Sequence, residues 1–151
     1  MTYRFCWHRE ARLYDSAGAE ISPGSPPPPS PPHGGEGRRL AAGLVCPDSP
    51  EGLAAAIGHP AFRIGAPDQP PPDLWEEPIL ETLTSGSTGL PRRIRRTQRS
   101  WAASFAVNAG LGIGPGARVA TLGRLIHSLS LYGAVEGLHL VLRERRERPQ
   151  R

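Results

Sequence analysis

The sequence predicts an α/β fold in which a partial parallel sheet is accompanied by flanking helices. Apolar runs of strand length alternate with segments of helical periodicity, and Pro- and Gly-rich tracts separate them. Strand, helix, strand and helix in succession is typical of a parallel sheet with crossover helices. Of the 151 residues, 18 are Pro and 18 are Gly, so we expect a folded core of roughly 100 residues.

The beginning of the chain is expected to contribute little regular structure. Residues 1–21 form an N-terminal segment that lacks the apolar stretch of a signal peptide. Residues 22–37 contain seven Pro and then a Gly-Gly-Glu-Gly run, which favours a surface loop in an extended polyproline II conformation. An alternative interpretation of this tract is a ligand for an SH3-type domain.

A strand, a short helix and a second strand are predicted next. Residues 40–45 are an apolar run of strand length. Ser49 is a suitable N-cap and Pro50 suits the first helical position, so a helix should begin here and stop at Gly58. Residues 62–64 then begin another strand before a second Pro-rich tract.

The second half of the chain repeats this alternation. Residues 79–84 predict a strand, and the helix that follows should end near Gly110. Residues 118–122 predict a further strand, and residues 128–140 predict a second helix. The residues that set the helical spacing are Trp101, Phe105 and Asn108 in the first helix and Leu131, Val135 and Leu138 in the second.

The positive charge of the chain comes entirely from arginine. The sequence has 18 Arg, no Lys, a formal net charge of +4 and a pI near 9.8, which favours anionic ligands.

Cys6 and Cys46 stand 40 residues apart without a partner at metal-ligand spacing, which argues against zinc and against a disulfide framework. Because no apolar run is long enough to span a membrane, we expect a cytoplasmic protein.

Residues 84–89 have the composition of a phosphate-binding loop. A strand leading into Ser, Thr and Gly exposes backbone N–H groups and hydroxyls together, and the glycines let the backbone approach a phosphate. Arg92 and Arg93 follow and could clamp outer phosphates. The candidate nucleotide-binding residues are Thr84, Ser85, Gly86, Ser87, Thr88, Gly89 and Arg92.

Residues 83–92, Leu-Thr-Ser-Gly-Ser-Thr-Gly-Leu-Pro-Arg, resemble the AMP-binding signature of the adenylate-forming superfamily. This superfamily includes acyl-coenzyme A synthetases and the adenylation domains of peptide synthetases. Arg92 stands where the family usually has Lys, and Arg93 stands where it usually has Gly. The resemblance extends over roughly residues 40 to 140, where His127-Ser128-Leu129 is similar to the family's next short motif.

The resemblance implies that the chain is the N-terminal part of an adenylate-forming domain. The family couples ATP to a carboxylic acid, releases pyrophosphate and usually passes the acyl group from the acyl-adenylate to a thiol. It implies that the loop holds the outer phosphates, that His127 is a catalytic residue on the acyl side, and that fatty acid metabolism is the setting. ATP or AMP, Mg²⁺, whose ligand is not in this chain, and coenzyme A are the implied cofactors and substrates.

Residues 38–142 are therefore interpreted as a partial AMP-binding domain, and residues 143–151 as a basic, solvated tail. Because the family's later motifs have no counterpart, we expect a truncated protein that is inactive alone and could need a completing protein fragment. The alternative is a non-catalytic interaction or regulatory fragment with a relic phosphate loop. A third hypothesis, nucleic-acid binding, depends on the arginine cluster Arg92, Arg93, Arg95, Arg96 and Arg99.

Overall fold

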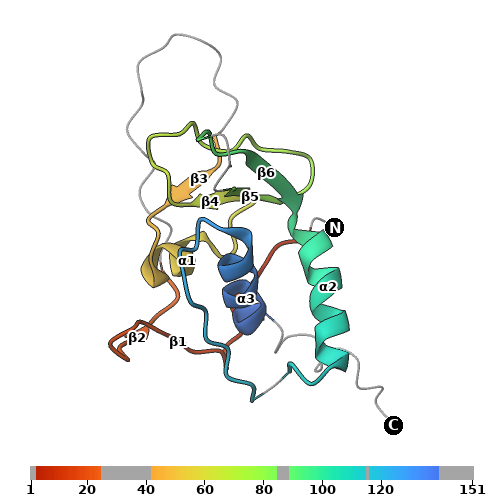
Figure 1. Cartoon of the computed structure of the whole chain (residues 1–151). Helices are drawn as coiled ribbons and strands as arrows, with labels where there is room; N and C mark the ends of the chain where they lie inside the picture. Colours follow the sequence, from red (N-terminus) through yellow and green to blue (C-terminus); the bar gives the residue numbers. More distant parts are fainter. Residues whose placement is uncertain (1–2, 25–41, 85–88, 115, 140–151) are drawn as a thin grey trace.

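The computed structural model describes residues 3–24, 42–84, 89–114 and 116–139 (Figure 1). The predicted Pro/Gly-rich loop from residue 25 onward, loop residues 85–88 and the basic tail at 143–151 lie outside the described residues. The elements, in chain order, are β1 (Leu13–Tyr14), β2 (Glu20–Ile21), β3 (Leu44–Cys46), α1 (Pro50–Ala56), β4 (Ala61–Ile64), β5 (Ile79–Leu83), β6 (Arg93–Thr97), α2 (Gln98–Gly110) and α3 (Ser128–His139).

The main sheet has the strand order β3-β4-β5-β6. β3 pairs with β4 and β4 pairs with β5 in parallel, which confirms the predicted parallel strands. β6 pairs with β5 in antiparallel orientation, so the sheet is mixed. The sequence did not predict β6 as a sheet strand, because its arginines resemble a solvated segment. A separate two-stranded sheet joins β1 to β2 near the N-terminus.

The three helices lie on one face of the main sheet (Figure 1). α1 begins as predicted, since the Ser49 hydroxyl accepts a hydrogen bond from the Gly52 N–H at 3.1 Å. α2 follows β6 directly and is capped by Thr97, whose side chain accepts from the N–H of Ser100. α2 ends at Gly110, and α3 buries the predicted face of Leu131, Val135 and Leu138.

The hydrophobic core fills the space between the helices and the sheet. Phe62 and Leu80 point into it from the strands, and Phe105 and Leu131 point into it from α2 and α3. Phe5 is also fully buried, and its ring lies 6.0 Å from that of Phe105 and 6.4 Å from that of Phe62. The N-terminal segment, to which the sequence assigned little structure, therefore supplies a central core residue.

The strand predicted at residues 118–122 is wrong. This stretch is irregular and mostly exposed, and it runs along α3 instead of joining the sheet. A Cβ added to Gly133 would meet Cγ2 of Thr121 at 3.1 Å, and one added to Gly137 would meet Cβ of Val119 at 3.3 Å. Two glycines on α3 thus allow the segment to approach the helix, while β6 occupies the free edge of β5.

Two further expectations concern the cysteines and the membrane. Cys6 and Cys46 are both thiols in the structure. Cys46 is buried at the end of β3, and burial raises the pKa of its thiol to about 11. None of the helices in the described ranges is long and apolar enough to cross a lipid bilayer.

Candidate functional site at the carboxyl ends of the parallel strands

Residues 124–127, which precede α3, cross the carboxyl ends of all three parallel strands and are called the crossing segment below. Ligands of open α/β sheets bind outside these ends. At β3, the Asp48 carboxylate accepts from the Leu125 N–H at 2.7 Å and from Nε of Arg124 at 2.9 Å. At β4, a Cβ added to Gly65 would lie 3.3 Å from Ile126, and the φ of Gly65 is +83°. Glycine therefore suits this close approach.

The crossing segment ends at His127, which is fixed against the end of β5. Nδ1 of His127 lies 3.2 Å from the carbonyl oxygen of Leu83. Because a carbonyl can only accept, Nδ1 is the donor in this hydrogen bond. The Leu83 N–H in turn donates to the carbonyl of Ile126 at 3.1 Å. With Nδ1 committed to Leu83, Nε2 is the imidazole atom through which His127 can contact a ligand.

Thr84 begins the loop directly after Leu83. Its N–H donates to the carbonyl of Arg92 at 2.9 Å, and its hydroxyl accepts from the Arg92 N–H at 3.2 Å. These contacts continue the β5–β6 pairing by one step, so the loop closes an antiparallel hairpin. The structure therefore brings Thr84, Arg92 and His127 to one end of the sheet.

The donors found here fit an anionic group. The Thr84 hydroxyl can donate its proton to an acceptor. The backbone of Arg92 pairs with Thr84, and the Arg92 side chain is exposed. Gly89, the last of the predicted loop residues, is exposed with a φ of +81°. Ser85, Gly86, Ser87 and Thr88 lie outside the described residues. In the described part of the chain, no group of three or more His, Cys, Asp or Glu side chains could hold a metal ion.

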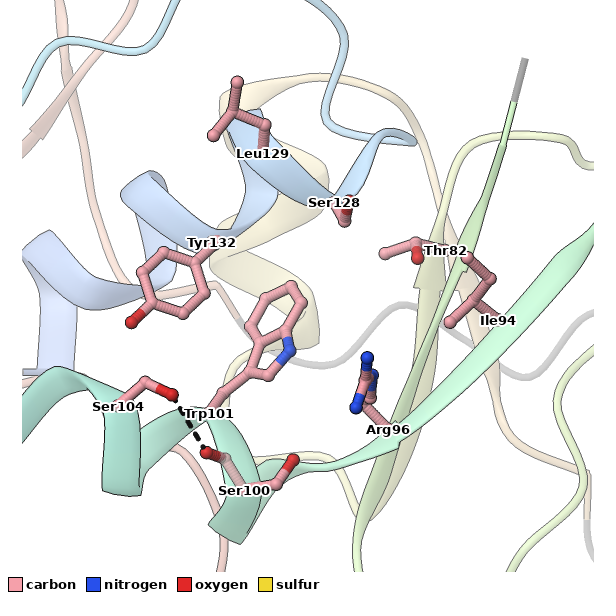
Figure 2. A pocket seen from close by; sticks show the side chains of 9 residues that line it. All are labelled: Thr82, Ile94, Arg96, Ser100, Trp101, Ser104, Ser128, Leu129 and Tyr132. Atoms are coloured by element: carbon pink, nitrogen blue, oxygen red, sulfur yellow. Dashed lines mark hydrogen bonds between the residues drawn. The ribbon is translucent and has the colours of Figure 1, made fainter. Parts of the chain in front are cut away.

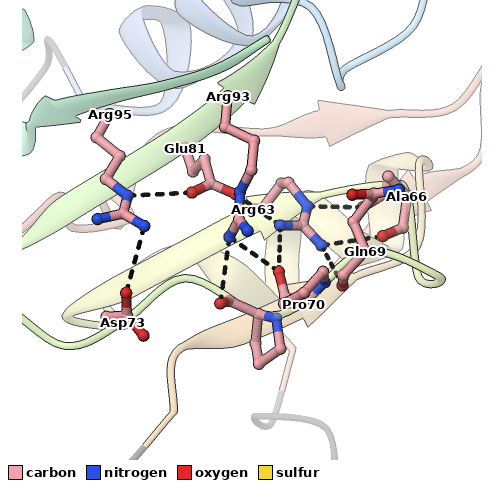
Figure 3. Close-up of polar contacts among 10 residues, drawn as sticks. Arg63, Ala66, Gln69, Pro70, Asp73, Glu81, Arg93 and Arg95 are labelled. Atoms are coloured by element: carbon pink, nitrogen blue, oxygen red, sulfur yellow. Dashed lines mark hydrogen bonds and ion pairs between the residues drawn. The ribbon is translucent and has the colours of Figure 1, made fainter. Parts of the chain in front are cut away.

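A buried ion network lies on the face of the sheet opposite the helices (Figure 3). At its centre, the fully buried Glu81 of β5 accepts from Arg63 Nη1 at 2.6 Å, from Arg93 Nε at 3.0 Å and from Arg95 Nε at 3.3 Å. Burial alone would raise the pKa of Glu81, but the hydrogen bonds and charges of Arg93 and Arg63 outweigh it and lower the pKa below its ordinary 4.5.

Arg63 uses all of its donors within this network. Its remaining N–H groups donate to carbonyl oxygens of the loop that follows β4, at distances of 2.7 to 3.2 Å. A guanidinium has five N–H donors, so the buried Arg63 is fully satisfied. The carbonyl partners are those of Gly65, Ala66, Gln69 and Pro70. The network thereby fastens this loop to the hairpin that carries Thr84 and Arg92.

The arginine cluster is divided between different environments. Arg93 and Arg95 bind Glu81, and Arg99 lies 3.9 Å from a carboxylate oxygen of Glu77. Arg96 points to the other face of the sheet, because side chains alternate along β6. The five arginines therefore do not form one continuous cationic surface, which removes the main support for the nucleic-acid hypothesis.

A pocket of about 430 Å³ opens on the helix face of β5 and β6 (Figure 2). Thr82 and Arg96 reach it from the strands, Trp101 from α2, and Ser128 and Tyr132 from α3. Burial and the charge of Glu136 raise the pKa of Tyr132 above its ordinary value. Ser128 directly follows His127, so the pocket adjoins the crossing segment.

Comparisons with known proteins support a likeness to acyl-CoA ligases. Proteins named as acyl-CoA ligases match part of this chain. One, named as a long chain fatty acid-CoA ligase, VraA, from Staphylococcus aureus strain COL, is 46% identical over 87 residues, which are 58% of this chain and 18% of that protein. Another, an uncharacterized acyl-CoA ligase, YhfT, from Bacillus subtilis strain 168, is 41% identical over 66 residues, which are 43% of this chain and 14% of that protein.

These matches are partial. The chain spans less than a fifth of the length of the relatives just described. No protein-family model matches the chain, and no solved structure matches it significantly. The α/β fold is consistent with that likeness.

Several features of the site were missed in the sequence. Glu81 is the one charged residue in β5, and its partners come from β4 and β6. The segment at β6 stands opposite an apolar strand and carries several arginines. Because side chains alternate along a strand, this pattern could have indicated a hairpin strand with Arg93 and Arg95 on one face and Ile94 and Arg96 on the other. Asp48 stands one residue before a predicted N-cap, and no local signal links it to Arg124.

Proposed function

We propose that this chain carries the nucleotide-phosphate loop and the acyl-side histidine of an acyl-CoA synthetase-like enzyme, which activates a carboxylic acid with ATP. The main support is the contact between His127 and Leu83, which are 44 residues apart in sequence. It brings the imidazole to the residue that precedes the loop. Partial identity to proteins named as acyl-CoA ligases supports the same proposal.

In this proposal the chain contributes positioning and electrostatic stabilisation. Thr84, Ser85 and Thr88 supply hydroxyl donors to the outer phosphates, and Arg92 takes the place of the family's Lys as the cation. His127 meets the acid through Nε2, because Nδ1 is held by Leu83. Rigid donors of this kind lower the barrier without reorganising during the reaction. The proposal also includes binding of Mg²⁺ and of coenzyme A. It further includes a second protein fragment that completes the domain.

The test is binding of ATP by the 151-residue chain, measured by isothermal titration calorimetry with magnesium present. The loop variant Thr84→Ala/Ser85→Ala/Thr88→Ala should lose binding, because it removes three hydroxyl donors. The matched control is Ser16→Ala, a hydroxyl deletion in the exposed turn between β1 and β2, which should bind ATP as the parent chain does. Circular dichroism of all three proteins verifies that they fold.

Two results would overturn the proposal. Absence of ATP binding by the parent chain would leave the loop without a nucleotide function. Equal ATP binding by the parent and by the loop variant would show that the nucleotide lies elsewhere. Loss of binding in the loop variant alone supports the phosphate loop.

A separate assay addresses catalysis. We expect no substrate-dependent pyrophosphate release from the chain alone, since it matches less than a fifth of the length of the ligases. Pyrophosphate is measured with ATP, magnesium and a panel of carboxylic acids. Robust release that depends on the acid would contradict this expectation and would show that the chain is sufficient for adenylation.

A further inference from the structure

The pocket on the helix face of β5 and β6 is lined by polar groups as well as aromatic ones. Five hydroxyl-bearing residues contribute to its wall, together with the guanidinium of Arg96 and the ring of Trp101 (Figure 2). The hydroxyl-bearing residues, apart from Tyr132, are Thr82, Ser100, Ser104 and Ser128. Its volume of about 430 Å³ is within the range of small-molecule sites.

Arg96 differs from its neighbours on β6. Arg93 and Arg95 turn toward the opposite face and bind the buried Glu81. Arg96 is paired across the strands with Leu80, which belongs to the helix-side core, so its side chain lies on the pocket side. In the described ranges, no carboxylate forms an ion pair with Arg96. The pocket therefore presents an unneutralised cation.

A purely aliphatic ligand would match this pocket poorly. Placing an alkyl chain over Arg96 and the hydroxyls would remove them from water without giving them hydrogen-bond partners, which is costly. A carboxylate, by contrast, can accept two parallel hydrogen bonds from a guanidinium and further ones from hydroxyls. The chemistry of the wall thus favours a ligand with an anionic group at this end.

The register of the hairpin sets the distance from Arg96 to the loop. Arg96 stands opposite Leu80, four residues before Thr84 on β5. At about 3.3 Å per residue, the two positions are separated by ~13 Å along the strand. The long Arg96 side chain covers part of this distance, and a short extended ligand covers the rest. A ligand with an acidic group at each end can therefore meet both Arg96 and the loop end of β5.

We propose that this pocket selects a short dicarboxylic acid, whose distal carboxylate binds Arg96. This inference rests on the proposed function in one respect, namely that the other carboxylate is the one activated near Thr84 and His127. It differs from what the name of VraA says of that protein, a long chain fatty acid-CoA ligase. Arg96 is in this proposal a specificity-determining residue.

The test compares adipate with hexanoate, two six-carbon acids that differ only in the second carboxylate. Binding of each to the full chain is followed by two-dimensional NMR, using the indole N–H of Trp101 in the pocket wall, identified with a Trp101→Phe variant. The parent chain should bind adipate more tightly than hexanoate. Arg96→Gln should weaken adipate binding roughly tenfold, as expected for loss of a charge-assisted hydrogen bond, and should reduce the preference of the chain for adipate over hexanoate.

The matched control is Arg99→Gln, three residues away on the exposed start of α2. It removes the same charge from the chain, so it corrects for general attraction of anions. The control should retain the preference for adipate. Equal binding of the two acids, absence of binding by either, or equal loss in Arg96→Gln and Arg99→Gln would overturn the proposal.

The outcome can be separated from that of the proposed function, because ATP binding is measured independently. If ATP does not bind but adipate binds through Arg96, the result supports a dicarboxylate site in the pocket and contradicts the proposed adenylating function. If ATP binds through the loop and neither acid perturbs the Trp101 signal, the pocket inference alone is wrong.

Discussion

Nδ1 of His127 lies 3.2 Å from the backbone carbonyl of Leu83, so the start of α3 is held to the end of β5 by a side-chain hydrogen bond. The Leu83 N–H completes the contact by donating to Ile126. Both polar groups of the Leu83 backbone are thus used to fix the segment before α3. The position of His127 relative to the loop depends on this pair.

Replacement of His127 should weaken this attachment in a way that depends on the donor. His127→Ala removes the hydrogen bond to Leu83 and should lower the free energy of unfolding by about 1 kcal/mol. His127→Asn keeps a side-chain N–H near the Nδ1 position and should lose less. Urea denaturation of the three proteins measures the difference. Equal stability of parent and His127→Ala would contradict a structural role for the contact.

Glu81 should be among the most sensitive positions of the chain. Glu81→Gln removes the negative charge that neutralises Arg63, whose side chain is fully buried. Breaking a buried pair by removing one partner costs about 3–5 kcal/mol. Arg95→Gln, the control, alters a partly exposed member of the same network and should cost less than about 1 kcal/mol. Chemical denaturation compares the two, and similar losses would argue that Glu81 is not central.

The stability of the protein should fall in acid in a manner that reports on Glu81. Its pKa is lowered in the folded state from an ordinary 4.5, so the folded state binds the proton less well than the unfolded state. The stabilisation from Glu81 is therefore complete above pH 4.5 and is lost as the pH falls below it. The melting temperature is measured from pH 7 to pH 3. Glu81→Gln should show a smaller decrease than the parent, and an identical decrease would be inconsistent with the lowered pKa.

The parts of the fold that were predicted correctly carry their signals locally. The Ser49 cap and Pro50 identify the start of α1 within two residues, and the apolar spacing of α2 and α3 identifies their buried faces. Thr84 follows a strand that is recognisable by its apolar residues. These elements need no knowledge of the partner segments.

The parts that were missed depend on contacts between distant segments. β6 is a strand because β5 offers an edge and Glu81 binds two of its arginines, neither of which is visible within Arg93–Thr97 itself. Phe5 is a core residue because α2 and β4 lie beside it. The stretch at 118–122 has strand composition, but it packs against α3, where Gly133 and Gly137 leave room for it. Such outcomes are decided by tertiary packing, which overrides local propensity.

Gln98 provides a prediction about how the N-terminal segment is held. Its side chain is fully buried at the start of α2. Oε1 accepts from the Phe5 N–H at 2.7 Å, while Nε2 donates to the carbonyls of His59 at 2.9 Å and Ile79 at 3.1 Å. One amide therefore joins the N-terminal segment, the turn before β4 and β5.

Gln98→Glu should test both ends of this amide. A carboxylate can still accept from the Phe5 N–H, but it cannot donate to the two carbonyls, which would face a buried negative charge. Each buried acceptor left without a partner costs about 1–3 kcal/mol, so we expect a loss of at least 2 kcal/mol at pH 7. Gln69→Glu, with an exposed side chain in the loop after β4, should change stability by less than about 0.5 kcal/mol. Thermal and urea denaturation measure both variants. A Gln98→Glu protein as stable as Gln69→Glu would mean that the Gln98 amide does not hold the three segments together.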